Sequence, residues 1–437
     1  MLERIADHTL DNGLKVICLR KPGAPLVAVQ VWYRTGSVNE YAGIRGTSHI
    51  LEHMMFRGSN RLGPQEHARR VNDVGGHSNA GTAEDVTLYL NTVPSDFLKE
   101  IVEMEADRMN GLSLDEGEFE KERRVVVEEY ETYMNNPMTK AMFEFRKEFF
   151  GDDPYAVSQL GALEDIQSVT CEQCREYYRK WYTPDNAVVV AVGDFEDEEA
   201  LFSLVERAFG SIPRSPERIG GGGADGAAVS LRDKPLWMRR RVAFDVPILM
   251  MGYRAPCSSH EDAVPLEILQ SAFAQGESSR LHRSLVRRQS MVLSAGGMNH
   301  FLRRAGISLF FTVFTPDKSP RRIGAALGEL VENVRNEGIS QEELEKVKNT
   351  SLTSRTFGLY SAEQIAQSIG FAETVEGDYH LWARRLKRIE TLTPAEVREA
   401  ARKYWRPEGA HTLVLTPKRV NPLLYLVGLF RRISSRF

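Results

Sequence analysis

The sequence is poor in cysteine and has no long hydrophobic run. Its 437 residues include four cysteines, which are too few for a disulfide scaffold of this size. No segment approaches the roughly 18 apolar residues of a membrane-spanning helix. The first residues carry charges where a secretory signal would be apolar. We therefore expect a cytoplasmic protein, or a periplasmic one if a signal peptide has been removed upstream.

The chain also lacks a strong charge of either sign. Its net charge is −4, which gives no reason to expect a nucleic-acid partner. Hydrophobic residues make up 42% and charged residues 27%, as in globular proteins. The length indicates two or three domains.

The spacing of Cys171 and Cys174 could indicate redox or metal chemistry. No second pair exists to complete a four-thiolate site, so we interpret these cysteines as structural.

The last residues, 419–437, combine an apolar stretch with a basic end. This tail is too short to span a bilayer. It could make peripheral membrane contact through residues 420–437 as a basic amphipathic helix, or pack on its own domain or on a partner.

A glycine- and proline-rich segment, residues 213–230, predicts a linker near the middle of the chain. Sequence matches on its two sides recur at a fixed offset of 223 residues, as in 393 − 170. The matched pairs are Ile166 and Ile389, Thr170 and Thr393, Lys180 and Lys403, and Pro184 and Pro407. We therefore predict two homologous domains, 1–212 and 231–418.

Each half mixes strand and helix patterns. In the first half the predicted strands are 9–10, 14–19, 26–33 and 187–192, and the predicted helices are 48–56, 65–74, 94–109 and 118–134. In the second half we expect strands at 241–246, 249–253 and 412–415, and a helix at 263–273. Hairpin-linked strands followed by runs of helices indicate an α+β fold, with a mainly antiparallel sheet packed with helices in each domain.

The segment His49-Ile50-Leu51-Glu52-His53 carries the clearest chemistry. On a helix, His49 and His53 lie on one face and can bind the same metal ion. Glu52 lies close by as a carboxylate base that need not be a ligand. This arrangement predicts a zinc hydrolase with the reversed spacing of the inverzincins. The helix at 263–273 has no such motif, so we expect one zinc per chain.

A third ligand is expected from the helix that contains Glu122 and Glu129. These two residues are seven apart and share a face with valines, where a buried carboxylate needs a cation or a partner. We assign Glu129 as the third ligand and Glu122 as a carboxylate that orients a ligand histidine. Glu128 points about 100° away and is expected to be solvated.

On these residues the chain resembles the pitrilysin/insulinase (inverzincin) metallopeptidases. It is most similar to the shorter branch with the bacterial processing-type peptidases and the mitochondrial processing peptidase β subunit. Met54-Met55-Phe56-Arg57-Gly58-Ser59 follows the histidines as in that family, and Glu129 lies 76 residues beyond His53 (129 − 53). The resemblance implies a zinc endopeptidase in which His49, His53 and Glu129 hold the metal and Glu52 is the catalytic base.

The segment from Gly76 to Thr82 resembles the family's strand beside the active site. The resemblance implies that an extended peptide or unfolded protein pairs with this strand, which assigns Gly76, Asn79, Ala80 and Thr82 to substrate binding. Asn79 either bonds the substrate backbone or only stabilises a turn.

One departure from the family concerns an arginine and a tyrosine that complete the site. By alignment on Ser279-Arg280-Leu281, these positions are Val286 and Leu293, which cannot polarise a carbonyl. Arg287 would need a one-residue slip to replace Val286. We therefore expect a homologous partner subunit that supplies the pair, giving a heterodimer, or else a homodimer. The alternative function is a non-catalytic, peptide-binding or assembly subunit of the same fold.

Overall fold

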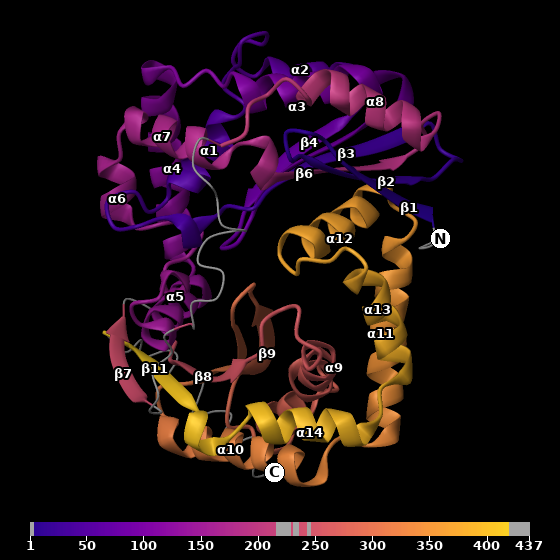
Figure 1. Ribbon diagram of the computed structural model, residues 1–437. Helices are drawn as coiled ribbons and strands as arrows, with labels where there is room; N and C mark the ends of the chain where they lie inside the picture. Colours follow the sequence, from indigo (N-terminus) through magenta and orange to yellow (C-terminus); the bar gives the residue numbers. More distant parts are fainter. Residues whose placement is uncertain (1–3, 216–228, 230–235, 243–245, 419–437) are drawn as a thin grey trace. The chain divides into compact units, whose positions relative to one another are not determined.

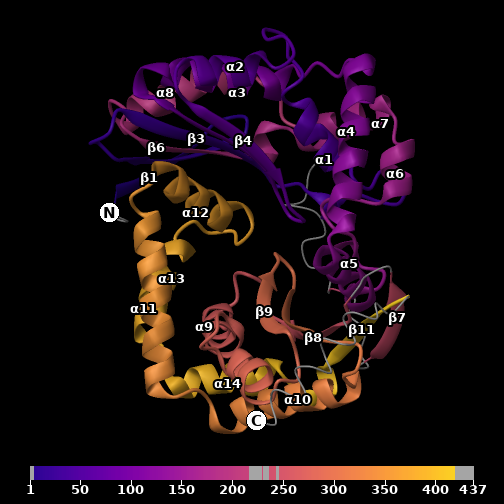
Figure 2. The same ribbon diagram turned by 180° about the vertical axis from the view of Figure 1, so that it is seen from behind.

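The structure is a computed structural model that describes residues 4–215, 229, 236–242 and 246–418. The tail 419–437, with its expected membrane contact, and most of the expected linker 213–230 lie outside the described residues. No described helix is both long and apolar enough to cross a membrane. The described chain divides into two compact units, and each combines a sheet with helices (Figures 1 and 2).

The first unit contains a six-stranded sheet in the order β1-β2-β6-β3-β5-β4. Only the β2–β6 pair is parallel, and the other neighbours are antiparallel. The strands are β1 (Ile5–Thr9), β2 (Lys15–Arg20), β3 (Leu26–Tyr33), β4 (His77–Thr82), β5 (Thr87–Pro94) and β6 (Ala187–Gly193). β3 and β6 are almost entirely buried, which explains their valine-rich sequences.

Helices cover both faces of this sheet. α3 and α8 pack on one face, and α12 packs against β3 and β6 on the other (Figure 1). The helices of this unit are α1 (Thr47–Met54), α2 (Glu66–Asp73), α3 (Leu98–Asn110), α4 (Glu116–Asn135), α6 (Leu163–Ser168), α7 (Cys171–Trp181), α8 (Glu198–Phe209) and α12 (Ala362–Thr374). We expected the third helix to start at residue 94. It starts at Leu98, because β5 continues to Pro94 and a 3-10 turn over Ser95–Phe97 follows.

The second unit contains a five-stranded sheet in the order β7-β11-β8-β10-β9, again with one parallel pair, β7–β11. Its strands are β7 (Trp237–Val242), β8 (Ile248–Ala255), β9 (Ser294–Phe301), β10 (Gly306–Val313) and β11 (His411–Pro417). Its helices are α5 (Pro137–Phe150), α9 (Ala263–Ala274), η6 (His282–Arg288), α10 (Pro320–Glu337) and α14 (Pro394–Tyr404), while α11 (Gln341–Gly358) and α13 (Leu381–Thr391) contribute residues to both units. β7 starts four residues before the strand expected at 241–246.

The two sheets repeat one topology, which agrees with the duplication inferred from the 223-residue offset. The order β2-β6-β3-β5-β4 corresponds to β7-β11-β8-β10-β9, with the parallel pair in the same place. The matched Thr170 and Thr393 play the same local role, since each caps its helix in a reciprocal capping box. The expected α+β fold with mainly antiparallel sheets is therefore confirmed.

The compact units have other boundaries than the two homologous domains that we predicted, 1–212 and 231–418. Residues 136–153 belong to the second unit, and residues 355–383 belong to the first. Each unit thus takes one helix from the other half of the sequence. α5 lies on β8 and β11, with Phe145 against Gly252, and α12 lies on β3, with Gly370 against Trp32. A side chain at either glycine would collide with the facing aromatic ring.

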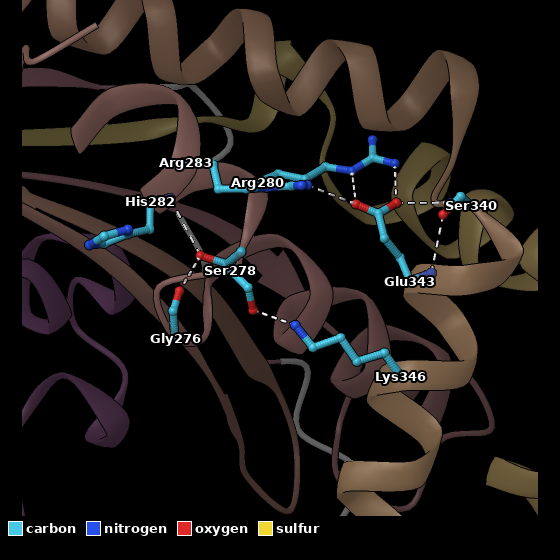
Figure 3. A network of polar contacts seen from close by, with 9 residues as sticks. Gly276, Ser278, Arg280, His282, Arg283, Ser340, Glu343 and Lys346 are labelled. Atoms are coloured by element: carbon cyan, nitrogen blue, oxygen red, sulfur yellow. Dashed lines mark hydrogen bonds and ion pairs between the residues drawn. The ribbon is translucent and has the colours of Figure 1, made fainter. Parts of the chain in front are cut away.

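A polar network fixes the Ser279-Arg280-Leu281 segment in the second unit (Figure 3). Arg280 forms a two-armed ion pair with Glu343 of α11, with Nε 2.9 Å from Oε1. Glu343 also accepts the backbone N–H of Ser340 at 2.9 Å and so caps the start of α11. The hydrogen bonds from Arg280 lower the pKa of Glu343 to about 2, so the pair stays ionised at neutral pH. This network holds the chain just before η6.

Candidate metal centre

The two histidines of the motif lie on one face of α1. The opposite side of this short helix is buried through Ile50, Leu51 and Met54, which fixes how the helix is rotated on the core. The rings of His49 and His53 are 5.0 Å apart between centroids and nearly perpendicular, at 87°. Their spacing of four residues therefore brings both imidazoles to the same place.

Glu129 of α4 completes a three-residue group with these histidines. Its Oε2 lies 3.6 Å from Nε2 of His49 and 3.5 Å from Nε2 of His53. A tetrahedral zinc with bonds of about 2.1 Å separates its ligand atoms by about 3.4 Å. The donor set and its spacing therefore fit one zinc ion with a position left for water. Among the described residues this is the group of three with metal-binding geometry.

A second carboxylate of α4, Glu122, lies behind His53. Its Oε2 is 3.1 Å from Nδ1 of His53, and its Oε1 is 2.6 Å from the Arg57 guanidinium. Glu122 is buried, and Arg57 supplies the positive charge that a buried carboxylate requires. An acceptor on Nδ1 leaves Nε2 of His53 free to face Glu129 and a metal.

Glu52 lies in the same turn of α1 and is held by β4. The hydroxyl of Thr82 donates to Oε2 of Glu52 over 2.6 Å. Burial raises the pKa of Glu52, while the bond from Thr82 and the nearby His53 act in the opposite direction. A raised pKa makes a carboxylate a better proton acceptor.

Burial also sets the protonation of His49. It lowers the pKa of His49 to about 4, and the neighbouring His53 adds to this effect. The imidazole is therefore neutral at physiological pH, which is the form that binds a metal.

The residues assigned to substrate binding lie on or beside β4, which is the edge strand of the first sheet. Ala80 pairs with Tyr89 of β5. Asn79 is exposed, and its Oδ1 accepts the backbone N–H of Ala80 at 2.9 Å. Gly76 just precedes the strand, where a side chain would meet the carbonyl oxygens of Val71 and Thr92.

The two positions that lack the family's arginine and tyrosine lie in the second unit. Val286 is in η6 and packs against the core of that unit. Leu293 donates its backbone N–H to Val313 over 2.7 Å. Arg287, beside Val286, forms an ion pair with Glu277.

The structural interpretation of Cys171 and Cys174 agrees with their environment. Both thiols are free and buried, and Cys171 donates to the carbonyl of Leu114. Burial raises the pKa of both thiols, which disfavours the reactive thiolate.

Sequence reasoning did not foresee the roles of Arg57 and Thr82 beside the site. A charged residue after a helix is usually solvated, so nothing in the pattern pairs Arg57 with Glu122. Thr82 was assigned to substrate binding because it lies on the edge strand. The alternation of side chains along a strand predicts only which face of the sheet the hydroxyl of Thr82 lies on. It does not predict the contact of that hydroxyl with Glu52.

Comparisons with known proteins point to one family of peptidases. A family model described as "Insulinase (Peptidase family M16)" matches residues 15–160, and one described as "Peptidase M16 inactive domain" matches residues 168–351. The zinc protease PqqE of Helicobacter pylori is 28% identical over 94% of this chain and 92% of its own length. All residues of the candidate metal centre fall within the first match.

Solved structures give the same result. A protease from Helicobacter pylori matches with a TM-score of 0.88 and 26% identity, covering 94% of this chain and 99% of that chain. The periplasmic protease PqqL from Escherichia coli has the same fold, with a TM-score of 0.73 and 19% identity. The match covers 97% of this chain but 48% of PqqL, so that protein contains about twice as much chain.

Proposed function

Since the chain belongs to the insulinase family of peptidases (peptidase family M16), we propose that it is a zinc-dependent endopeptidase that cleaves extended peptides. The observation that carries this proposal is the convergence of His49, His53 and Glu129, with Glu52 beside them but bonded to Thr82. A purely structural zinc site has no use for a carboxylate base that is not a ligand.

Each residue of the site has a distinct task in peptide hydrolysis. His49, His53 and Glu129 would hold a zinc ion, which when bound acidifies water and polarises the scissile carbonyl. Glu52 takes a proton from the attacking water and delivers it to the leaving amine. Thr82 keeps one oxygen of Glu52 occupied, so the other oxygen is the one that exchanges the proton.

The substrate would bind by adding a strand to β4. In the described part of the first unit, β4 pairs with β5 on one side, and its other edge is available for backbone hydrogen bonds. Strand addition reads the extended shape of a peptide more than its side chains. Unfolded segments are therefore the proposed substrates.

A partner subunit is part of this proposal. The side chains of Val286 and Leu293 offer no hydrogen-bond donor where the family has an arginine and a tyrosine, and Arg287 forms an ion pair with Glu277. We expect the purified chain to be weakly active alone and fully active when mixed with a homologous chain that carries the pair. Full activity of the lone chain would contradict the paired-subunit proposal.

The catalytic assignment is tested with three variants. Glu52→Gln should keep its zinc and lose nearly all peptidase activity, because an amide cannot accept the proton. Glu129→Gln should lose zinc, whereas Glu128→Gln, on the exposed neighbouring position, should change neither property. Zinc content by metal analysis and cleavage of an unfolded protein are the two measurements. Unchanged turnover in Glu52→Gln would refute the catalytic role.

The second candidate is a non-catalytic peptide-binding or assembly subunit. The description "inactive domain" for residues 168–351 favours it for that part of the chain. The same Glu52→Gln experiment separates the two functions, since a binding subunit would have no turnover to lose.

A further inference from the structure

The helix that carries the ligand histidines begins without a cap of its own. Its N-cap residue is Gly46, which has a φ of 105° and no side chain to accept a hydrogen bond. A Cβ at this position would lie 2.6 Å from Cγ1 of Ile166. The N-cap must therefore be glycine, and the first N–H groups of α1 need an acceptor from elsewhere.

Glu40 supplies this acceptor from the preceding loop. Its Oε2 accepts the N–H of Gly46 and its Oε1 accepts the N–H of Ser48, each over 2.7 Å. The carboxyl group is buried, and its negative charge lies at the positive end of the helix dipole. Two oxygens on two N–H groups fix both the position and the rotation of the first turn.

The same turn is anchored a second time through the side chain of Ser48. Its hydroxyl lies 2.9 Å from the hydroxyl of Tyr177 on α7, and Tyr177 lies 2.8 Å from the hydroxyl of Thr35. Tyr177 also donates to the carbonyl of Gly36. The start of α1 is thus tied to a buried set of groups beside Glu40.

His49 depends on this anchoring more than His53 does. Nδ1 of His53 contacts Glu122, which orients that ring. Nδ1 of His49 is buried and has no hydrogen-bond partner among the described residues. The direction of the His49 ring must therefore come from the helix and its packing, and His49 follows Ser48 directly in the turn that Glu40 holds.

The charge of Glu40 is costly for the fold. Burial raises the pKa of Glu40 to about 7, although the N–H groups of Gly46 and Ser48 act against this shift. The environment as a whole thus disfavours the ionised form, and a neutral residue would cost less. A stabilising role alone does not explain a carboxylate here.

We propose that Glu40 is a positioning residue for the metal centre, whose carboxylate holds the first turn of α1 so that His49 faces Glu129. The proposal deepens the function proposed above and rests on it. It adds Glu40 to the residues that determine the affinity for zinc, although Glu40 does not touch the metal.

The test compares Glu40→Gln with a matched control at pH 8. Glutamine keeps the size but offers one acceptor, and its NH2 group opposes the second N–H. Asp165→Asn is the control, because Asp165 likewise accepts two backbone N–H groups, those of Gly43 and Arg45, but none from α1. We measure the Kd for zinc by competition with a chelating dye, and the urea midpoint of the metal-free protein.

We expect Glu40→Gln to raise the zinc Kd by about tenfold or more, as for other groups that orient ligands, without lowering the urea midpoint. Asp165→Asn should leave the Kd unchanged. Glu40→Asp, which keeps the charge but is too short to reach both N–H groups, should weaken zinc binding as Glu40→Gln does. An unchanged zinc Kd in Glu40→Gln overturns the inference, as does a loss of affinity matched by an equal loss in Asp165→Asn. A wild-type chain that binds no zinc would instead overturn the proposed metal centre itself.

Discussion

Replacing Gly46 by alanine should destabilise the protein far more than the same change at Gly43. Both glycines have a left-handed backbone, with φ of 105° and 100°. A Cβ at Gly43 meets nothing within 4 Å, whereas at Gly46 it would lie 2.6 Å from Ile166 and 3.3 Å from the carbonyl oxygen of Leu160. Gly43→Ala thus carries the backbone cost alone, about 1 kcal/mol. Gly46→Ala adds overpacking of about 2 kcal/mol, for a total of about 3 kcal/mol.

Urea unfolding of the metal-free protein measures both values. The double variant Gly46→Ala/Ile166→Ala removes the colliding side chain, so in the Ile166→Ala background the cost of Gly46→Ala should fall to about 1 kcal/mol. Equal losses for the two single variants, or additive losses in the double variant, would refute the argument that Ile166 enforces glycine at the start of α1.

Three further predictions follow from other contacts. Arg57→Met leaves the buried Glu122 without its cation and should weaken zinc binding by about tenfold, as measured by competition with the chelating dye. An unchanged zinc Kd would show that this ion pair does not contribute to metal affinity. Ser290→Gly should raise the free energy of unfolding by about 0.5 kcal/mol, because Ser290 has a φ of 47° that glycine adopts without strain. A lower free energy of unfolding in urea would show instead that the serine side chain stabilises the fold. The pKa of Glu40 is higher in the folded than in the unfolded state, so its contribution to stability is complete below about pH 4 and is lost as the pH rises through about 7. The stability of the wild type relative to Glu40→Gln should therefore fall by about 3 kcal/mol over that range, and a flat difference in urea unfolding across pH would contradict the raised pKa.

Local and repeated features were the predictable part of this protein. The 223-residue offset predicted the duplication, and the spacing of His49, Glu52 and His53 predicted that their side chains lie on one helix. The assignment of Glu129 as a ligand is a prediction that rests on the cost of placing a carboxylate on a valine-rich face and on the family resemblance. The two inferences about helices use the period of 3.6 residues, which relates residues over a few turns.

The contacts that hold the candidate ligands in place join residues from different parts of the fold. No hydrophobic periodicity in the sequence predicts such contacts. Glu40 lies in a loop, where a glutamate is normally solvated, and Arg57 follows a helix as many surface arginines do. The exchange of α5 and α12 between the halves is equally invisible, since an amphipathic helix shows which of its faces is apolar but not which sheet it will cover.

The position of α12 in the chain has a consequence for biosynthesis. The face of the first sheet that carries Ile17, Trp32 and Val190 is covered by α12, which ends at Thr374. The ribosome must therefore synthesise well over a hundred residues after β6 before α12 can cover this apolar surface. A fragment that stops at the glycine-rich stretch would keep the candidate ligands His49, His53 and Glu129, yet it should aggregate or recruit chaperones, because one face of its sheet would lack its covering helix.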